Sequence, residues 1–210
     1  MPSTTSTPVS SPPPARKRSF APVVNRDVRL LVLGSLPGDA SLAQGQYYGH
    51  KQNRFWHLMG AVVGVDLPAL DYGARLHALL AHGVGLWDVI AEARRDGSLD
   101  SNIRQQDNND LLGLLEQLPA LETIAFNGGT AARLGLKALQ EHAARYRIVV
   151  LPSSSPAYTL AYADKRQAWL ALQDSADDTG AVTTSVTIAV TIAVTTAVTT
   201  ADTAATTTGA

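Results

Sequence analysis

Short apolar runs alternate with longer amphipathic stretches through the middle of the chain. Four runs are rich in Val, Leu and Ile, are bounded by Gly, Asn or Pro, and cover residues 28–33, 83–89, 123–126 and 147–151. Runs of this length and composition are typical of strands that are buried on both faces. They predict the strands of a parallel sheet.

Between these runs, apolar residues recur at the three- and four-residue spacing of amphipathic helices. The spacing predicts helices at about residues 55–63, 76–80, 111–118, 131–143 and 160–172. Strands that alternate with helices pair in parallel through right-handed crossovers. We therefore expect an α/β fold, a three-layer α/β/α sandwich around a central, mainly parallel sheet of about four strands.

The two ends of the chain differ from its middle. Residues 1–24 hold six of the eleven prolines, and residues 176–210 are a Thr/Ala/Val tract with a four-residue repeat. Such segments lack the apolar mass to close a core. We expect a disordered arm over 1–24, one catalytic domain over 25–175 and a low-complexity tail over 176–210. The tail also places Val and Ile on one face at period two, so strand pairing is the alternative to disorder.

Composition excludes several kinds of function. The absence of cysteine excludes disulfides, thiolate metal sites and cysteine nucleophiles. Without three basic residues of the arm and three acidic residues of the tail, the 17 basic and 18 acidic residues become 14 and 15. Nucleic-acid binding must therefore rest on local features. No apolar run reaches the roughly 20 residues of a membrane span, so we expect a cytoplasmic protein with no membrane partner.

Ligands of parallel sheets bind beyond the carboxyl ends of the strands. The segments that follow the four predicted strands are 34–38, Asp88, 127–129 and 152–156, and all are polar or rich in small residues. Turn residues are common at strand ends in any case. The pattern nevertheless makes this edge of the sheet the candidate binding site.

The segment after the first strand is the richest in candidate chemistry. Gly34 allows close approach of the backbone, the amides of Ser35 and its neighbours can face a carbonyl, and Tyr47 or Tyr48 offers a face for stacking. A planar ligand would suit this loop. The structural alternative is that the two tyrosines cap the core and that Asn53 caps the helix after it.

Eight motifs together resemble the deoxyinosine (hypoxanthine) DNA glycosylase family of the uracil-DNA glycosylase superfamily, over about residues 19–172. In chain order they are Gly34-Ser-Leu-Pro-Gly38, Ser41-Leu42, Gln46-Tyr-Tyr-Gly-His50, Asn53-Arg-Phe-Trp56, Gly85-Leu-Trp-Asp-Val-Ile90, Gly97-Ser-Leu-Asp-Ser101 with Ile103, Phe126-Asn-Gly128 and Leu151-Pro-Ser-Ser-Ser-Pro156. The resemblance implies the same α/β/α sandwich. It implies no cofactor and no metal.

The resemblance also implies roles for single residues. The loop 34–38 lacks the Asp or Asn common in the superfamily. The family it resembles instead uses an asparagine just before the Phe-Trp helix, and Asn53 stands at that position, so the resemblance implies that Asn53 is the catalytic residue, which orients water or polarises a base carbonyl. Gly34, Ser35, Tyr47 and Tyr48 are expected to bind the base. Asp88 stands where related enzymes read the base and would accept a hydrogen bond from N1–H of hypoxanthine; a helix cap or an ion pair is its alternative role.

A second motif is expected to contact DNA. Its residues are Pro152, Ser153, Ser154, Ser155 and Pro156. Small hydroxyl residues with exposed amides can bind phosphate without a basic side chain.

Four further features have weaker interpretations. Tyr158 replaces the Asn usual in the family two residues after the second motif, so its role stays open. The pair 94–95 is expected to be a solvated face or a contact with the DNA backbone, and residues 98–101 a phosphate-contacting loop or a simple turn. The five histidines lack recognisable zinc spacing.

These observations predict a monofunctional DNA glycosylase that hydrolyses the N-glycosidic bond of a deaminated base and leaves an abasic site. Hypoxanthine is the expected base, with uracil as the alternative, in double- or single-stranded DNA. We expect a monomer in the cytoplasm, associated with the nucleoid when it acts on DNA. The competing hypotheses are a catalytically silent binding module for damaged DNA or nucleotides, and a hydrolase of free nucleosides.

Overall fold

The computed structural model describes residues 16–173. Its elements are β1 (Arg16–Arg18), β2 (Leu30–Gly34), α1 (Asp39–Gln44), α2 (Phe55–Val63), η1 (Leu67–Ala69), α3 (Tyr72–Ala81), β3 (Val84–Asp88), β4 (Ile90–Arg95), η2 (Asp100–Asn102), β5 (Ile103–Asn108), α4 (Leu111–Leu115), β6 (Thr123–Asn127), α5 (Gly129–Leu139), η3 (Gln140–Arg145), β7 (Arg147–Leu151) and α6 (Tyr162–Leu170).

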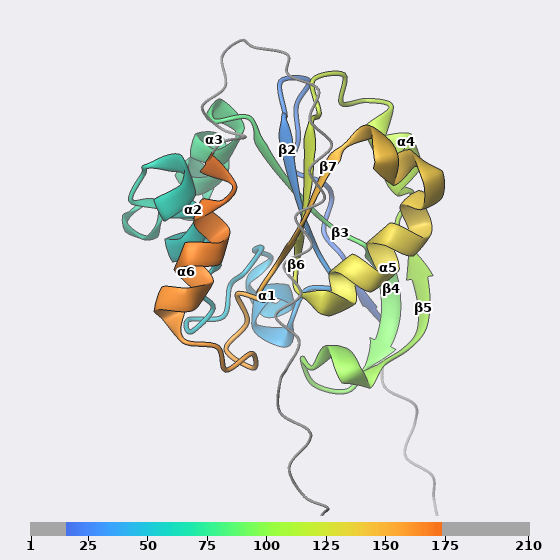
Figure 1. The fold of residues 1–210 in the computed structure, drawn as a ribbon. Coiled ribbons are helices and arrows are strands. Elements are labelled where there is room, and N and C mark those ends of the chain that lie inside the picture. The colour runs from blue at the N-terminus through green and yellow to red at the C-terminus, as the bar shows by residue number, and fades with distance from the viewer. Residues whose placement is uncertain (1–15, 174–210) are drawn as a thin grey trace, which may run out of the picture.

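The centre of the molecule is a four-stranded, all-parallel sheet in the order β3-β2-β6-β7 (Figure 1). Its strands are the four predicted from the apolar runs. In register, Leu30 of β2 lies beside Val84 of β3, and Gly34 lies beside Asp88. The carboxyl ends of these strands therefore meet at one edge of the sheet.

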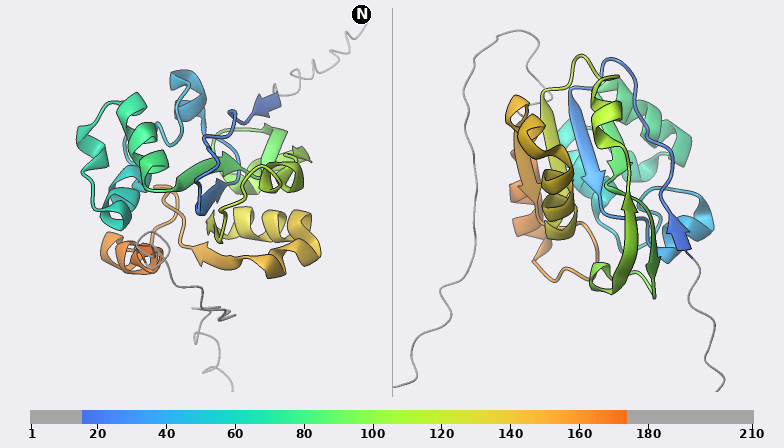
Figure 2. Two further views of the ribbon diagram at one scale, coloured as in Figure 1. Left: turned by 90° about the horizontal axis from the view of Figure 1, so that it is seen from above. Right: turned by 90° about the vertical axis from the view of Figure 1, so that its right-hand side faces the viewer.

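Alternating residues of β2 point into two separate cores. Leu30 and Val32 pack in the cluster that contains Phe55 of α2 and Trp169 of α6. Leu31 and Leu33 pack with the leucines of α4 and the small residues of α5 on the other face. Figures 1 and 2 show α2, α3 and α6 on one side of the sheet and α4 and α5 on the other. The predicted three-layer α/β/α sandwich is confirmed.

A second, antiparallel sheet in the order β1-β4-β5 was not predicted. Its strands carry many charged and amide side chains, and irregularities in the β4–β5 register break the two-residue alternation that signals a strand. Two helix predictions also need correction. Helix α1 lies in a segment expected to be a loop, and the helix expected over 131–143 ends at Leu139 and continues as the 3-10 helix η3.

The domain begins earlier than residue 25. Strand β1 pairs with β4, and Val23 exchanges backbone hydrogen bonds of 2.9 and 3.0 Å with Leu86 of β3. Residues 16–24 thus belong to the fold, because backbone pairing orders them and Phe20, Val23 and Val24 pack against the two cores. The remaining parts of the expected arm and tail, 1–15 and 174–210, lie outside the described residues.

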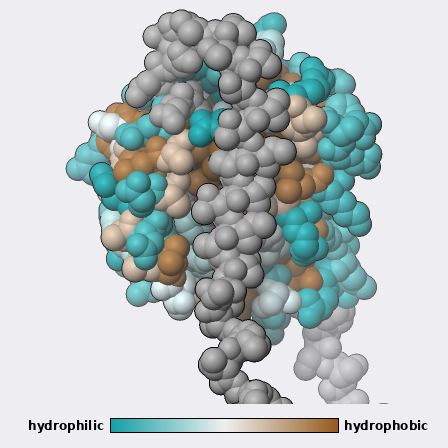
Figure 3. All heavy atoms as spheres, in the orientation of Figure 1, coloured by the Kyte–Doolittle hydropathy of each residue, from teal (hydrophilic) through white to brown (hydrophobic). Residues whose placement is uncertain are grey.

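The face drawn in Figure 3 mixes polar and apolar side chains. The large apolar residues most exposed among those described include Val150 on β7 and the trio Tyr158, Leu160 and Tyr162 that precedes and opens α6. Within residues 16–173, no helix has both the length and the apolar character that crossing a membrane requires.

Candidate active site

The ends of β2 and β3 bring a carboxylate against a glycine. Asp88, the last residue of β3, is only 4% exposed, and its Oδ2 atom is buried without a hydrogen-bond partner among the described residues. A Cβ atom at Gly34 would lie 2.5 Å from Asp88 Oδ1 and 3.3 Å from the Tyr48 hydroxyl. Only glycine lets these two side chains converge over the end of β2.

Tyr48 supplies the second polar atom of this site. Its hydroxyl is buried and also lacks a partner within the described part of the chain, while its ring stacks on Phe55 with centroids 3.6 Å apart. The backbone of Tyr48 has a φ of 54°, in the left-handed region that residues other than glycine seldom adopt. Strain of this kind persists where the surroundings fix the residue and is common at functional sites.

Burial controls the electrostatics of the site. It raises the pKa of Asp88 to about 7, against the opposing effect of Arg95 and with a smaller contribution from Asp100. Burial also raises the pKa of Tyr48; the charge of Asp88 adds to this effect, and the nearby side chain of Asn127 opposes it. Near neutral pH the site therefore holds a carboxyl group close to its midpoint and a phenol that keeps its proton.

Tyr47 lies in a different environment from Tyr48. It is 3% exposed, its hydroxyl donates to the carbonyl of Ala21 over 3.2 Å, and its ring packs edge-on against Phe20 at 5.2 Å. Its backbone N–H donates to the Tyr72 hydroxyl. Tyr47 is thus a core residue that anchors the N-terminal segment, which matches the structural alternative rather than the stacking role.

Asn53 stands at the turn before α2, as expected. Its Oδ1 accepts a hydrogen bond of 2.9 Å from the N–H of Phe55, the first residue of α2, so its amide pairs with a backbone donor at the helix start, although Arg54 is the N-cap residue. The next N–H, of Arg54, donates to the carbonyl of Ser154 over 3.0 Å. The turn that carries Asn53 is therefore fastened to the second motif, about 100 residues away in sequence.

The second motif is held by a pair of reciprocal bonds. Ser154 is 1% exposed, its N–H donates to Asn127 Oδ1 over 2.8 Å, and Asn127 Nδ2 donates to its Oγ over 2.9 Å. Gly128, which follows Asn127, has a φ of 107°, and a Cβ there would lie 3.1 Å from the Cβ of Ser153. The end of β6 and the loop after β7 thus form one unit. Ser154 supports this unit from inside and is not placed for direct contact with DNA.

The other two serines of the motif lie closer to the surface. Ser153 Oγ accepts from the N–H of Ser155, and Ser155 Oγ accepts from the N–H of Ala157, each over 3.2 Å. A hydroxyl that accepts from the backbone keeps its own proton for donation. Ser153 and Ser155 can therefore still bind an anion.

Tyr158 lies on the surface beside this loop and is 48% exposed. The ammonium of buried Lys165 donates to the carbonyls of Tyr158 and Ser155, over 2.7 and 3.2 Å, and lies 5.3 Å from the Tyr158 ring. Arg54 lies over the ring of Tyr162 at 5.8 Å. Sequence reasoning missed Lys165, because a lysine near a helix start is ordinarily a surface residue.

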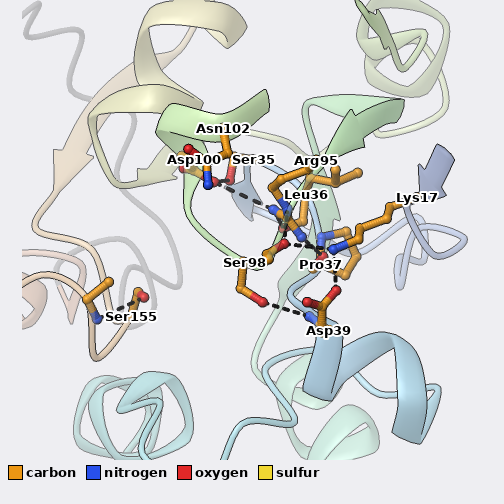
Figure 4. A network of polar contacts seen from close by, with 12 residues as sticks. Lys17, Ser35, Leu36, Pro37, Asp39, Arg95, Ser98, Asp100, Asn102 and Ser155 are labelled. Carbon is orange, nitrogen blue, oxygen red and sulfur yellow. Dashed lines mark hydrogen bonds and ion pairs between the residues drawn. The ribbon is translucent and has the colours of Figure 1, made fainter. Parts of the chain in front are cut away.

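The loop from Gly34 to Gly38 is held from the antiparallel sheet (Figure 4). Ser35 Oγ donates to Asp100 Oδ1 over 2.8 Å, so its hydroxyl is engaged away from Asp88. Arg95 is 1% exposed and donates to the carbonyls of Leu36 and Pro37. The expectation that residues 94–95 form a solvated face is therefore wrong for Arg95.

The segment 98–101 supports the same loop. Ser98 Oγ accepts from the N–H of Asp39 over 3.0 Å, and Asp100 receives the bond from Ser35. These contacts agree with a supporting turn and not with a phosphate-binding loop. Among the described residues, no three His, Asp or Glu side chains are grouped to hold a metal ion.

The structure thus brings Gly34, Tyr48 and Asp88 together. It also joins the turn of Asn53 to the second motif through Ser154. It places Tyr47 in the core beside Phe20 and turns the hydroxyl of Ser35 toward Asp100.

Comparison with known proteins places this site in a family context. Residues 21–174 match the family described as the uracil DNA glycosylase superfamily. A hypoxanthine DNA glycosylase of Methanosarcina barkeri is 36% identical over 156 residues, which cover 73% of this chain and 96% of the relative. A hypoxanthine DNA glycosylase of Methanosarcina acetivorans is 38% identical over 158 residues, 74% of this chain and 97% of the relative.

The fold is similar to a solved structure as well. A solution NMR structure of a Methanosarcina acetivorans protein, described as a candidate uracil DNA glycosylase, superposes with a TM-score of 0.69 at 37% identity. The match covers 77% of this chain and 99% of the other.

Proposed function

Because the chain belongs to the uracil DNA glycosylase superfamily and its similar relatives are named for hypoxanthine, we propose that it is a DNA repair glycosylase. It hydrolyses the N-glycosidic bond of a deaminated base and leaves an abasic site. Water adds to C1′ of the sugar, and the base leaves with the bonding electron pair and takes up a proton. Such an enzyme reaches its target atom by extruding the nucleotide from the helix.

The observation that carries this proposal is the pair of buried polar atoms without partners, Asp88 Oδ2 and the Tyr48 hydroxyl. Buried groups in this state cost about 1–3 kcal/mol each unless a ligand satisfies them. An ionised carboxylate accepts hydrogen bonds, and a protonated phenol can donate one. A ligand that presents an N–H next to a carbonyl would satisfy both.

Deaminated bases carry this arrangement. Hypoxanthine presents N1–H beside O6, and uracil presents N3–H beside O4, whereas adenine and cytosine present a ring acceptor beside an amino group. An acceptor that faces the ionised Asp88 carboxylate would lose a hydrogen bond, which disfavours adenine and cytosine by about 1–3 kcal/mol. Guanine and thymine carry the same N–H beside a carbonyl, so this contact does not reject them. Hypoxanthine is the proposed substrate and uracil the alternative.

Of these two groups, the Tyr48 hydroxyl would also assist departure of the base. Negative charge spreads onto the carbonyl oxygen as the glycosidic bond breaks, and a phenol donor at that oxygen stabilises it. Tyr48 is the proposed donor. Asp88 is assigned to recognition only, because a carboxylate repels a departing anion. Asn53, in the turn that leads into Tyr48's stacking partner Phe55, would orient the water or polarise a base carbonyl.

DNA would approach along the second motif. The hydroxyl protons of Ser153 and Ser155 remain available for phosphate oxygens, and the surface of Tyr158, Leu160 and Tyr162 extends from this loop with Arg54 beside it. We propose double- or single-stranded DNA with a deaminated base as the partner of a cytoplasmic monomer.

The test is single-turnover excision from duplexes and single strands that carry hypoxanthine, uracil, xanthine or adenine at one position, read by alkaline cleavage of abasic sites. We expect hypoxanthine to be excised fastest and Asp88→Asn to narrow the ratio of hypoxanthine to adenine about tenfold or more, since an amide can turn its donor toward adenine. Asp27→Asn, at an exposed position before the start of β2 and so at the end of that strand opposite Gly34, is the matched control.

Each outcome has a distinct meaning. Binding without abasic sites would favour the catalytically silent module over an enzyme. Cleavage of free inosine but not of DNA would favour a nucleoside hydrolase. An excision ratio that Asp88→Asn leaves unchanged would make Asp88 part of the scaffold.

A further inference from the structure

Arg95 is the most buried charged side chain of the described chain, and its position calls for an explanation. It lies at the end of β4, in the antiparallel sheet, but its guanidinium binds the loop that follows β2 of the parallel sheet. The bond to Leu36 O measures 3.1 Å, a second runs to Pro37 O, and a third joins Nε to Gly97 O over 3.2 Å. Asp100 Oδ1 lies 3.7 Å from the same group.

We infer that Arg95 is a positioning residue of the base site: it holds the loop from Gly34 to Gly38 against the ends of β2 and β3 and keeps a buried positive charge at this edge of the sheet, where β3 ends in Asp88. This inference rests on the proposed function for its activity readout. It assigns no contact between Arg95 and DNA.

The hydrogen bonds fix the direction of the loop's peptide groups. A trans peptide is planar, and its C=O and N–H point in opposite directions. When the Pro37 carbonyl faces the guanidinium, the N–H of Gly38 must point away from it. Leu36 and Pro37 lie only two and three residues beyond Gly34, the residue against which Asp88 and Tyr48 converge. A displacement of this loop would therefore also move Gly34, against which Asp88 and Tyr48 pack.

Charges of both signs surround the guanidinium. Asp100 and Ser35 are joined by their own hydrogen bond, Asp39 at the start of α1 is paired with Lys17 of β1, and Lys17 also donates to the Gly97 carbonyl over 2.7 Å. Figure 4 shows these side chains meeting around the loop. Burial lowers the pKa of Arg95, while Asp100, Asp39 and Asp88 all favour its charged form.

Arg95 and Asp100 act on Asp88 in opposite directions. Burial raises the pKa of Asp88 most; the positive charge of Arg95 opposes this effect, and the negative charge of Asp100 adds to it. Loss of Arg95 should therefore favour the protonated form of Asp88, and loss of the Asp100 charge should favour the ionised form. A merely structural role would not produce shifts of opposite sign.

The experiment compares Arg95→Gln, Arg95→Lys and Asp100→Asn with Arg94→Gln, which removes one positive charge from the neighbouring position of the same strand. Carbon-13 NMR follows the carboxyl of Asp88 against pH, and single-turnover excision of hypoxanthine is measured over the same range. The NMR titration needs no activity, so it separates failure of this inference from failure of the proposed function. Circular dichroism verifies that each variant folds.

We expect Arg95→Gln to move the Asp88 midpoint to higher pH by about half a unit or more, and Asp100→Asn to move it to lower pH. Arg95→Gln should slow excision on the order of 10–100-fold, as expected for a misplaced site. Arg95→Lys keeps the charge but not the forked donor, so it should slow excision with a smaller shift of the midpoint. Arg94→Gln should leave both unchanged.

The inference would be overturned if Arg95→Gln left the midpoint of Asp88 in place, or if Arg94→Gln shifted it equally. Shifts of the same sign in Arg95→Gln and Asp100→Asn would also contradict it. If Arg95→Gln does not fold, Arg95→Lys decides: this variant keeps the charge but not the forked donor, so excision at the wild-type rate would overturn the inference.

Discussion

Asp88→Asn should stabilise the fold at neutral and alkaline pH while it impairs base recognition. The wild-type carboxylate is buried, and its Oδ2 lacks a partner within residues 16–173. Asparagine has nearly the same shape and carries no charge. The substitution therefore removes the cost of ionising a buried group and leaves the packing around Gly34 almost intact.

The size and sign of this effect follow from the pKa of Asp88. A value of about 7 in the fold, against about 3.9 in the unfolded chain, means that the unfolded state ionises first as pH rises. The stabilising contribution of the neutral acid is complete below about pH 4 and is lost as pH rises through about 7. At roughly 1.4 kcal/mol per pKa unit, the free energy of unfolding falls by about 4 kcal/mol over this window.

Urea denaturation of both proteins at several pH values between 4 and 8 would measure the effect. The five histidines and all other acids are common to both proteins, so the difference between the two unfolding free energies isolates Asp88. We expect this difference to change by about 4 kcal/mol in favour of Asp88→Asn, mostly between pH 4 and pH 7. A difference that stays constant with pH would refute the reasoning, because it would mean that Asp88 ionises alike in both states.

Three further predictions concern the site and the start of the domain. Asn53→Ala should lower the single-turnover rate of excision on the order of 10²–10³-fold. Asn53→Asp keeps the acceptor for the N–H of Phe55, so it should restore the melting temperature but not the excision rate. Recovery of both the melting temperature and the rate would show that Asn53 only stabilises the start of the helix. Gly34→Ala should cost about 1–3 kcal/mol in urea denaturation and abolish excision, because its Cβ would collide with Asp88. Deletion of residues 1–18 should lower the melting temperature by about 2–4 °C or more relative to deletion of residues 1–15. The reason is that only the longer deletion removes β1. Equal melting temperatures of the two truncated proteins would show that β1 adds nothing to stability.

The parallel sheet was predictable because burial on both faces leaves a direct mark on the sequence. Each of its strands is an apolar run, and polar residues at the strand ends marked the edge where Gly34 and Asp88 meet. The strands of the antiparallel sheet have no apolar run of this kind in their sequence. In β5 only Ile103 is buried, so its composition is that of an exposed loop. Backbone pairing with β4, which a local pattern does not reveal, makes it a strand.

Which residues form the site could be predicted better than which of their side chains point into it. Tyr47 and Tyr48 are identical neighbours in the sequence, and the left-handed backbone at Tyr48 decides that one enters the core while the other reaches Asp88. Similarly, Arg94 and Arg95 are indistinguishable in sequence, yet Arg95 is buried. Which of two like residues turns inward depends on long-range contacts, here the loop carbonyls that need a donor.

The bridge between Val23 and Leu86 has a consequence for self-association. Strand β3 lies at the edge of the parallel sheet, and an unpaired edge offers N–H and C=O groups to any extended chain. Val23 occupies one such pair of groups and so blocks the middle of this edge against a second molecule. Substitutions in the segment before β2 would then first appear as oligomers or aggregates at high protein concentration, while the chemistry of the remaining monomers stays unchanged.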